Sequence, residues 1–203
     1  MAERAATLLI GCGALAPEVL AVASGFPGAF DLVCLPAQWH NTPERIAPGV
    51  RARIREARAE GYRRILVLYG DCGSGGGLDQ VLAQEGVKRI AGPHCYQFYM
   101  GTAAFTELAE AEPGCFFLTD YLARHFDRLI IEGLGLDRHP ELRDDYFRHY
   151  TKLVYLAQTE DPELTRIAAA AADRLELAFQ RVFTGYGELG QFMRAHAPAP
   201  IHG

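Results

Sequence analysis

Short apolar runs alternate with longer amphipathic segments along this chain. Continuous runs of four to seven residues are typical of buried strands, and the sequence predicts them at 7–11, 31–35, 64–70, 88–91, 116–119, 153–157 and 178–183. Val50, Ile54 and Ala57 form one apolar stripe in a segment otherwise rich in Arg and Glu, which predicts a helix covering a sheet. A second, alanine-rich helix is predicted at 164–175.

Two helix starts share a local pattern. Thr42-Pro43-Glu44 and Asp161-Pro162-Glu163 each offer a capping residue, a proline at the first helical position and an acid in the first turn. Strands and helices that alternate over long connections predict parallel strands joined by right-handed crossovers. The sequence therefore predicts an α/β fold of three layers, a largely parallel sheet with helices on both faces.

The length of 203 residues suits one substantial core, so we expect a single α/β domain at 1–194 and a flexible tail at 195–203. The connection between the strands at 116–119 and 153–157 exceeds the usual crossover length. It predicts a helical insertion around 121–150 that serves as a lid or as a contact in a homo-oligomer.

Charge and hydropathy exclude several classes of partner. The formal net charge is −5 and the arginines are scattered, so nucleic acid is not expected as a partner. The apolar runs are too short to span a membrane. The start of the chain lacks the basic and small-residue pattern of a signal peptide, and the sequence therefore predicts a cytoplasmic protein.

The five cysteines fall into two groups. Cys34 and Cys115 lie among apolar neighbours and are assigned to the core. Cys12, Cys72 and Cys95 instead stand beside or close to glycines just after three predicted strands, where ligands bind in open parallel sheets. We expect these three to share one site. The alternative is that three small residues fill three tight turns and never meet.

Three thiolates with an open position suit a catalytic zinc ion or an iron–sulfur cluster with one iron not held by the protein. His94 could close that position as a fourth ligand, or act with His40 and Asp71 in acid–base steps. The other polar residues at strand ends are candidates for binding a small-molecule substrate: Asn41, Ser74, Tyr96, Asp120 and Gln158. Each of them could equally cap a helix.

The glycine-rich run at 73–77 invites a phosphate-binding interpretation, but it lacks the spacing of the standard phosphate loops. A tight turn that brings Cys72 to the sheet edge is the preferred interpretation.

Taken together, several motifs resemble a known family. They are Gly11-Cys12-Gly13-Ala14-Leu15, Leu35-Pro36-Ala37 with His40-Asn41, Gly70-Asp71-Cys72-Gly73, Gly92-Pro93-His94-Cys95-Tyr96, Phe117-Leu118-Thr119-Asp120 and Leu156-Ala157-Gln158-Thr159. On these residues, the chain from about Leu8 to Leu189 resembles the bacterial and archaeal domain-of-unknown-function family 1638. Relatives tend to lie near genes for corrinoid-dependent methyl transfer from methylated amines, so the resemblance implies a setting in one-carbon metabolism.

Three functions follow as hypotheses. The first is a metal-dependent protein, such as a transferase or lyase, that binds its metal through Cys12, Cys72 and Cys95. The second is an accessory protein that binds a corrinoid protein or a methyltransferase without catalysing turnover. The third is an enzyme without a metal, in which one cysteine attacks the substrate.

Overall fold

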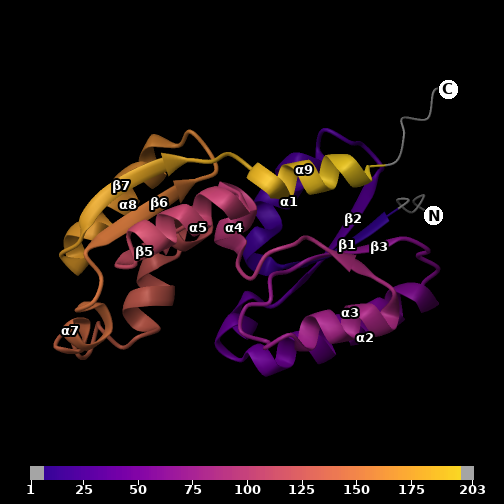
Figure 1. Ribbon diagram of the computed structural model, residues 1–203, viewed down its shortest axis with the longest axis horizontal. Coiled ribbons are helices and arrows are strands. Elements are labelled where there is room, and N and C mark those ends of the chain that lie inside the picture. The colour runs from indigo at the N-terminus through magenta and orange to yellow at the C-terminus, as the bar shows by residue number, and fades with distance from the viewer. Residues whose placement is uncertain (1–6, 198–203) are drawn as a thin grey trace. The chain divides into compact units, whose positions relative to one another are not determined.

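The computed structural model describes residues 7–197, which fold into two compact units (Figure 1). The first unit takes in the chain up to Phe98 and the part from Tyr186 onward, and the second runs from Tyr99 to Gly185. Each unit has a parallel sheet of its own. The predicted α/β class with parallel strands is confirmed, although the strands are divided between two sheets rather than collected in one.

The first unit has a four-stranded sheet in the order β2-β1-β3-β4. Its parallel strands are β1 (Thr7–Cys12), β2 (Phe30–Leu35), β3 (Ile65–Leu68) and β4 (Lys88–Arg89). Three short 3-10 helices, η1 (Gly13–Leu15), η2 (Ala37–Asn41) and η3 (Pro43–Arg45), lie in the connections. The longer helices are α1 (Ala16–Ala23), α2 (Ile46–Ala59), α3 (Gly77–Glu85) and α9 (Gly187–His196).

Helices cover both faces of this sheet, as Figure 1 shows, with α2 and α3 on one side and α1 and α9 on the other. Alternation along β1 explains the arrangement, because successive side chains point to opposite faces. Leu8 and Ile10 belong to the core cluster that contains Ile54 of α2. Leu9, between them, is fully buried but lies outside that cluster. The predicted stripe of Val50, Ile54 and Ala57 is fully buried.

The second unit has a three-stranded sheet in the order β5-β6-β7. The parallel strands are β5 (Cys115–Leu118), β6 (Lys152–Ala157) and β7 (Ala178–Phe183). Its helices are α5 (Thr102–Ala111), α6 (Asp120–Arg124), α7 (Leu142–Phe147), α8 (Pro162–Leu175) and a π-helix, η4 (Asp127–Glu132). The short helix α4 (Cys95–Met100) crosses from one unit to the other.

Neighbouring aromatics on β5 show how this second sheet is covered. The Phe116 ring packs against Phe147 and Tyr150, with ring centroids 5.2 and 5.6 Å away. The Phe117 ring lies 5.0 Å from the Phe105 ring of α5. Because adjacent side chains of a strand face opposite ways, α5 and the helical insertion lie on opposite faces of the sheet.

The structure also tests the local predictions. The segment at 121–150 is helical as expected, in the form of α6, η4 and α7. Asp161 caps α8 by accepting hydrogen bonds from the amides of Glu163 and Leu164. Thr42, in contrast, makes no capping bond, and α2 begins four residues later.

The two ends of the chain are described only in part. Helix α9 continues through His196, and residues 198–203 of the expected tail lie outside the described part. Among the described residues, no helix is both long enough and apolar enough to cross a membrane.

Candidate functional site

The cysteine-bearing loops of the first unit surround the place where its strand order reverses. The chain leaves β1 for β2 on one side, while β3 lies on the other side of β1. In parallel sheets, this reversal opens a crevice beyond the carboxyl ends of the two strands, which is where ligands bind. Cys12 is the last residue of β1, and Tyr69 directly follows β3. The order of the strands in the sheet therefore places the side chains of Cys12 and Tyr69 at the crevice.

Cys12 begins the first cysteine loop. Its side chain packs, as do those of Tyr69 and Cys72, on the side of the sheet that α2 covers. The amide of Ala14 hydrogen-bonds to the thiol, but burial has the larger effect and raises the pKa of Cys12 above its usual value. Gly13 lies close to the next loop, since a Cβ there would lie 3.2 Å from the Leu35 carbonyl oxygen.

The loop after β3 is bound tightly to the loop that carries Cys95. The amide of Cys72 donates to the Pro93 carbonyl oxygen at 2.9 Å. A Cβ at Gly70 would lie 2.6 Å from that oxygen and 3.2 Å from the Cys72 sulfur, so only glycine permits this approach. Cys72 has a φ of 47°, a left-handed conformation that is uncommon for a residue with a side chain. Such strain is often found at functional sites.

The three thiols influence one another's ionisation. Burial raises the pKa of Cys72 to about 11, and the neighbouring Cys12 adds to the shift. Burial also raises the pKa of Cys95, followed by the effects of Cys72 and Cys12. The side chains therefore lie near one another. Within residues 7–197, however, no three His, Cys, Asp or Glu side chains are already arranged to hold a metal ion.

Tyr69 is a member of this cluster that the sequence analysis missed. Its side chain is 1% exposed, and its hydroxyl interacts with the Cys12 thiol, although the geometry is not that of a standard hydrogen bond. Burial raises the pKa of Tyr69, and both Cys12 and Cys72 contribute. A buried hydroxyl normally has a well-placed partner, so a loose contact with a thiol leaves this hydroxyl available to a bound ligand. A tyrosine that ends an apolar run gives no such signal in the sequence.

Glu18 is a second residue that was missed. It lies in the first turn of α1, where an acid is expected for helix-capping reasons, yet its side chain is only 3% exposed. Its charge contributes to the raised pKa of Cys95. The sequence shows that Glu18 lies in the first helical turn, but not that its side chain is buried near the Cys95 thiol.

The predicted acid–base residues His94, His40 and Asp71 lie close enough to interact. Burial lowers the pKa of His94, the charge of His40 lowers it further, and Asp71 opposes both effects. The two histidines are exposed. His94 is therefore neutral near pH 7 and can accept a proton.

Asp71 also organises its own loop. Its carboxylate accepts hydrogen bonds from the Ser74 hydroxyl at 2.6 Å and from the amides of Gly76 and Gly75 at 2.9 and 3.2 Å. These bonds lower the pKa of Asp71, with the Ser74 bond contributing most. The glycine-rich run is thus the tight turn that the sequence analysis preferred. Ser74 was predicted to contact a substrate, but its hydroxyl donates its hydrogen bond to Asp71 within this turn.

Asn41 and Tyr96 are placed in the first unit, on η2 and α4. Asn41 is exposed, and the Tyr96 ring centroid lies 6.5 Å from that of His94. Cys34 is exposed on β2 rather than buried in the core as predicted, because β2 is an edge strand. Cys115 is buried, as predicted.

The remaining two predicted substrate residues, Asp120 and Gln158, belong to a closed network in the second unit. Asp120 is fully buried. Its carboxylate accepts four hydrogen bonds at 2.6–3.1 Å, from the Tyr155 hydroxyl, the Thr159 hydroxyl and the backbone amides of Gln158 and Thr159. The Gln158 side-chain oxygen accepts from the Asp120 amide at 2.7 Å. The network joins the ends of β5 and β6.

Comparison with known proteins identifies a family. The model described as "Protein of unknown function (DUF1638)" matches residues 34–193. This segment includes Cys72 and Cys95, whereas Cys12 precedes it. A search of curated proteins finds no similar protein. Because the family model matches most of the chain, the chain belongs to the DUF1638 family.

Proposed function

We propose that this protein binds a thiolate-held metal centre, a zinc ion or an iron–sulfur cluster, through Cys12, Cys72 and Cys95. The observation that carries the proposal is the convergence of three thiols from three separate loops on the strand-order reversal of the first sheet. Thiolates are the preferred ligands of both kinds of centre. Binding would draw the three sulfurs together from their present positions.

The electrostatics of the cluster favour a metal over a metal-free nucleophile. A reactive cysteine needs a lowered pKa, which positive neighbours or helix N-termini supply. Here burial raises the pKa of all three thiols, to about 11 for Cys72, and Arg89 offsets only a little of that shift. Metal binding releases the thiol protons and supplies the missing positive charge.

The surrounding residues suit a substrate bound at an open position of the centre. A metal ion held by these residues would lower the pKa of a bound thiol or water. His94 is neutral near pH 7 and can take up the released proton, with His40 beside it. The Tyr69 hydroxyl can donate a hydrogen bond to a sulfur of the centre. Activation of a substrate thiol for methyl transfer is the chemistry we propose for the site.

Elemental analysis and an absorption spectrum of anaerobically purified protein test the proposal. We expect zinc without colour, or iron with sulfide and a brown colour, in the native protein. Cys72→Ser should lose the metal, while Cys34→Ser should keep it. Cys34 is exposed on an edge strand, and its side chain faces the opposite side of the sheet from Cys12. Circular dichroism confirms that both variants fold. Equal metal content in the two variants contradicts the proposal.

A further inference from the structure

Strand β7 forms a free edge of the second sheet. It pairs with β6 on one side only, since the sheet order is β5-β6-β7. Two of the four exposed large hydrophobic side chains in the described part of the chain lie on it, Phe179 at 37% and Phe183 at 52%. Natural edge strands are commonly protected from pairing by lysine, proline or a bulge. β7 contains no lysine or proline, and its register with β6 runs without a break, so pairing with another strand is open to it.

Hydrogen bonds to β6 show which backbone groups of β7 face its outer side. The amide of Ala178 donates to the Thr151 carbonyl oxygen at 3.1 Å, and the Thr184 amide makes the equivalent bond to Ala157 at 2.9 Å. Backbone groups alternate in direction along a regular strand, so the even-numbered residues of β7 face β6. The odd-numbered residues therefore turn their amides and carbonyls toward the open edge: Phe179, Arg181 and Phe183.

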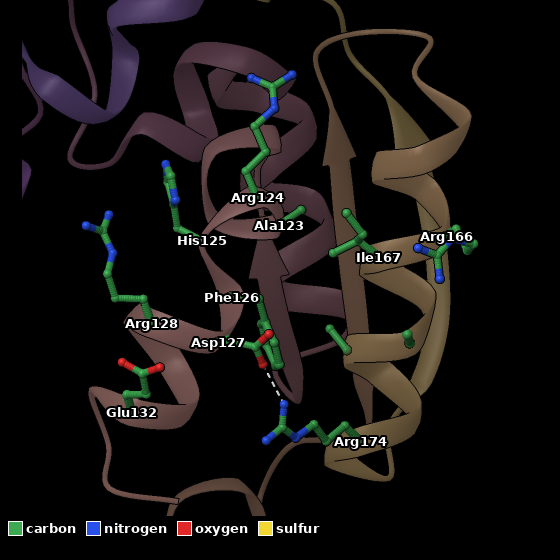
Figure 2. A pocket seen from close by; sticks show the side chains of 12 residues that line it. Ala123, Arg124, His125, Phe126, Asp127, Arg128, Glu132, Arg166, Ile167 and Arg174 are labelled. Carbon is green, nitrogen blue, oxygen red and sulfur yellow. Dashed lines mark hydrogen bonds and ion pairs between the residues drawn. The ribbon is translucent and has the colours of Figure 1, made fainter. Parts of the chain in front are cut away.

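The exposed edge of β7 is separate from the hollow of the second unit. This hollow measures about 650 Å³ and lies between the segment from Ala123 to Glu132 and one side of α8 (Figure 2). No residue of β7 lines it. A concave pocket is typical of a site for a small molecule, whereas a strand edge suits a second strand. The two phenylalanines are therefore placed for contact with a protein.

The sequence of β7 is suited to a second copy of itself. Phe179, Arg181 and Phe183 share one face of the sheet, because they alternate with Gln180 and Val182. The stretch has an aromatic residue at each end and Arg181 at its centre, so it presents the same pattern in both directions. Antiparallel pairing of two identical strands requires such a pattern, because each strand meets the other reversed.

We propose that the protein forms a symmetric homodimer in which β7 of one copy pairs antiparallel with β7 of the second copy. The pairing is centred on Arg181, so that Phe179 of each copy lies opposite Phe183 of the other. The three outward-facing residues then form hydrogen-bonded pairs, each of which exchanges two bonds. This two-fold arrangement closes on itself and leaves no β7 edge open. It does not depend on the metal centre, since β7 belongs to the second unit.

The charges near the symmetry axis are compatible with this register. Like charges directly opposite each other weaken a strand pair, and Arg181 faces its own copy here. The Arg181 guanidinium group is bound to Glu160 at 2.6 Å, and it lies over the Phe183 ring, 5.7 Å from the centroid. The Glu160 side chain is 70% exposed, so it can also reach the second arginine. Each copy thus brings a negative charge that balances its arginine at the axis.

Analytical ultracentrifugation of the full chain tests the dimer. We expect the native protein to sediment as a dimer of the 22.3 kDa chain. Phe183→Glu should weaken the dimer at least about tenfold, because two-fold symmetry places the change at both ends of the pairing. The matched control is Tyr146→Glu, which replaces an aromatic residue of the same unit that is 46% exposed but lies outside β7. It should dimerise like the native protein.

A compensating substitution tests the register. Adding Phe179→Lys to Phe183→Glu brings opposite charges together at each end of the pairing, so the double variant should recover the dimer. Circular dichroism confirms that the variants fold. A native protein that is a monomer overturns the proposal, and so does a dimer that Phe183→Glu leaves intact. A double variant that stays as weak as Phe183→Glu overturns the register centred on Arg181.

Hydrogen exchange measured by NMR on the native protein provides a readout that needs no variant. The amides of Phe179, Arg181 and Phe183 should become protected as the protein concentration rises, because they bond to the second copy. The amides of Gln180 and Val182 serve as internal controls, since they face β6 in the monomer as well. Fast exchange at the three outward amides in a dimeric sample overturns the pairing through β7.

Discussion

Polar groups gather at strand ends in both units, but they are satisfied very differently. In the second unit, Asp120 accepts four hydrogen bonds and Tyr155 donates one of them. In the first unit, the Tyr69 hydroxyl is just as buried but has only a loose contact with the Cys12 thiol, and Cys72 has a strained backbone. A closed network stabilises a fold, whereas an incomplete one leaves groups available to a ligand. The comparison teaches that strand-end position alone does not mark a functional residue.

The largest expected effect is a loss of stability when the closed network around Asp120 is broken. Asp120→Ala leaves the Tyr155 hydroxyl and the amides of Gln158 and Thr159 buried without acceptors. We expect the free energy of unfolding to fall by about 3–5 kcal/mol, measured by urea denaturation. Asp173→Ala, an exposed position of the same unit, should change it by less than about 0.5 kcal/mol. A small change at Asp120 would mean that the network is not structural.

The next effect concerns the contact between the two cysteine loops. Gly70→Ala forces the loops apart, because its Cβ would lie 2.6 Å from the Pro93 carbonyl oxygen. We expect a loss of stability of about 1–3 kcal/mol together with a loss of bound metal. Gly77→Ala is the matched control, since a Cβ there makes an ordinary 3.7 Å contact with Ala47. Thermal melting and metal analysis of both variants check the prediction; retained metal in Gly70→Ala would contradict it.

The two buried tyrosines permit a direct comparison by the same substitution. Tyr155→Phe removes a hydrogen bond to Asp120 and should destabilise the protein by about 1–2 kcal/mol. Tyr69→Phe removes a hydroxyl whose contact with the Cys12 thiol is loose, so stability should change by less than about 0.5 kcal/mol or rise. Metal affinity should fall in Tyr69→Phe alone. Equal destabilisation in the two variants would remove the distinction between the two strand-end clusters.

The smallest effect concerns His125, which lies outside the closed network. Burial, Arg128 and Arg124 lower its pKa in the folded state, so the unfolded chain binds the proton more tightly. Stability from this group is therefore present above about pH 6.5 and is lost as the pH falls through that value. In Arg128→Gln, the NMR titration midpoint of His125 should move up toward its ordinary value. A midpoint that does not move would show that burial and Arg124 cause the shift without Arg128.

The sequence predicts single elements well because periodicity and capping are local. All seven strands were found from their apolar runs, and Asp161-Pro162 correctly indicated the start of α8. Pairing between strands is not local, which is why the division into two sheets was not foreseen. It occurs after β4, which is only two residues long.

Prediction of the candidate site from the sequence is limited in the same way, because contacts between distant residues are not local. The glycines beside the cysteines indicated where Cys12, Cys72 and Cys95 should lie, and the structure brings their thiols within electrostatic range. Tyr69 looked like a core residue because its contact with the Cys12 thiol is a property of three-dimensional packing. The role of Asp120 likewise depends on partners 35–39 residues away.

Helix α9 links the order of synthesis to the folding of the unit that carries the cysteine cluster. The chain leaves the first unit after Phe98 and returns to it only at Tyr186. Leu189 and Met193 of α9 are fully buried, and α9 contacts α1, the helix that carries Glu18. On the ribosome, the cysteines therefore emerge long before the last helix that completes their unit. Until α9 is made, the first unit lacks the side chains of Leu189 and Met193, which complete its core.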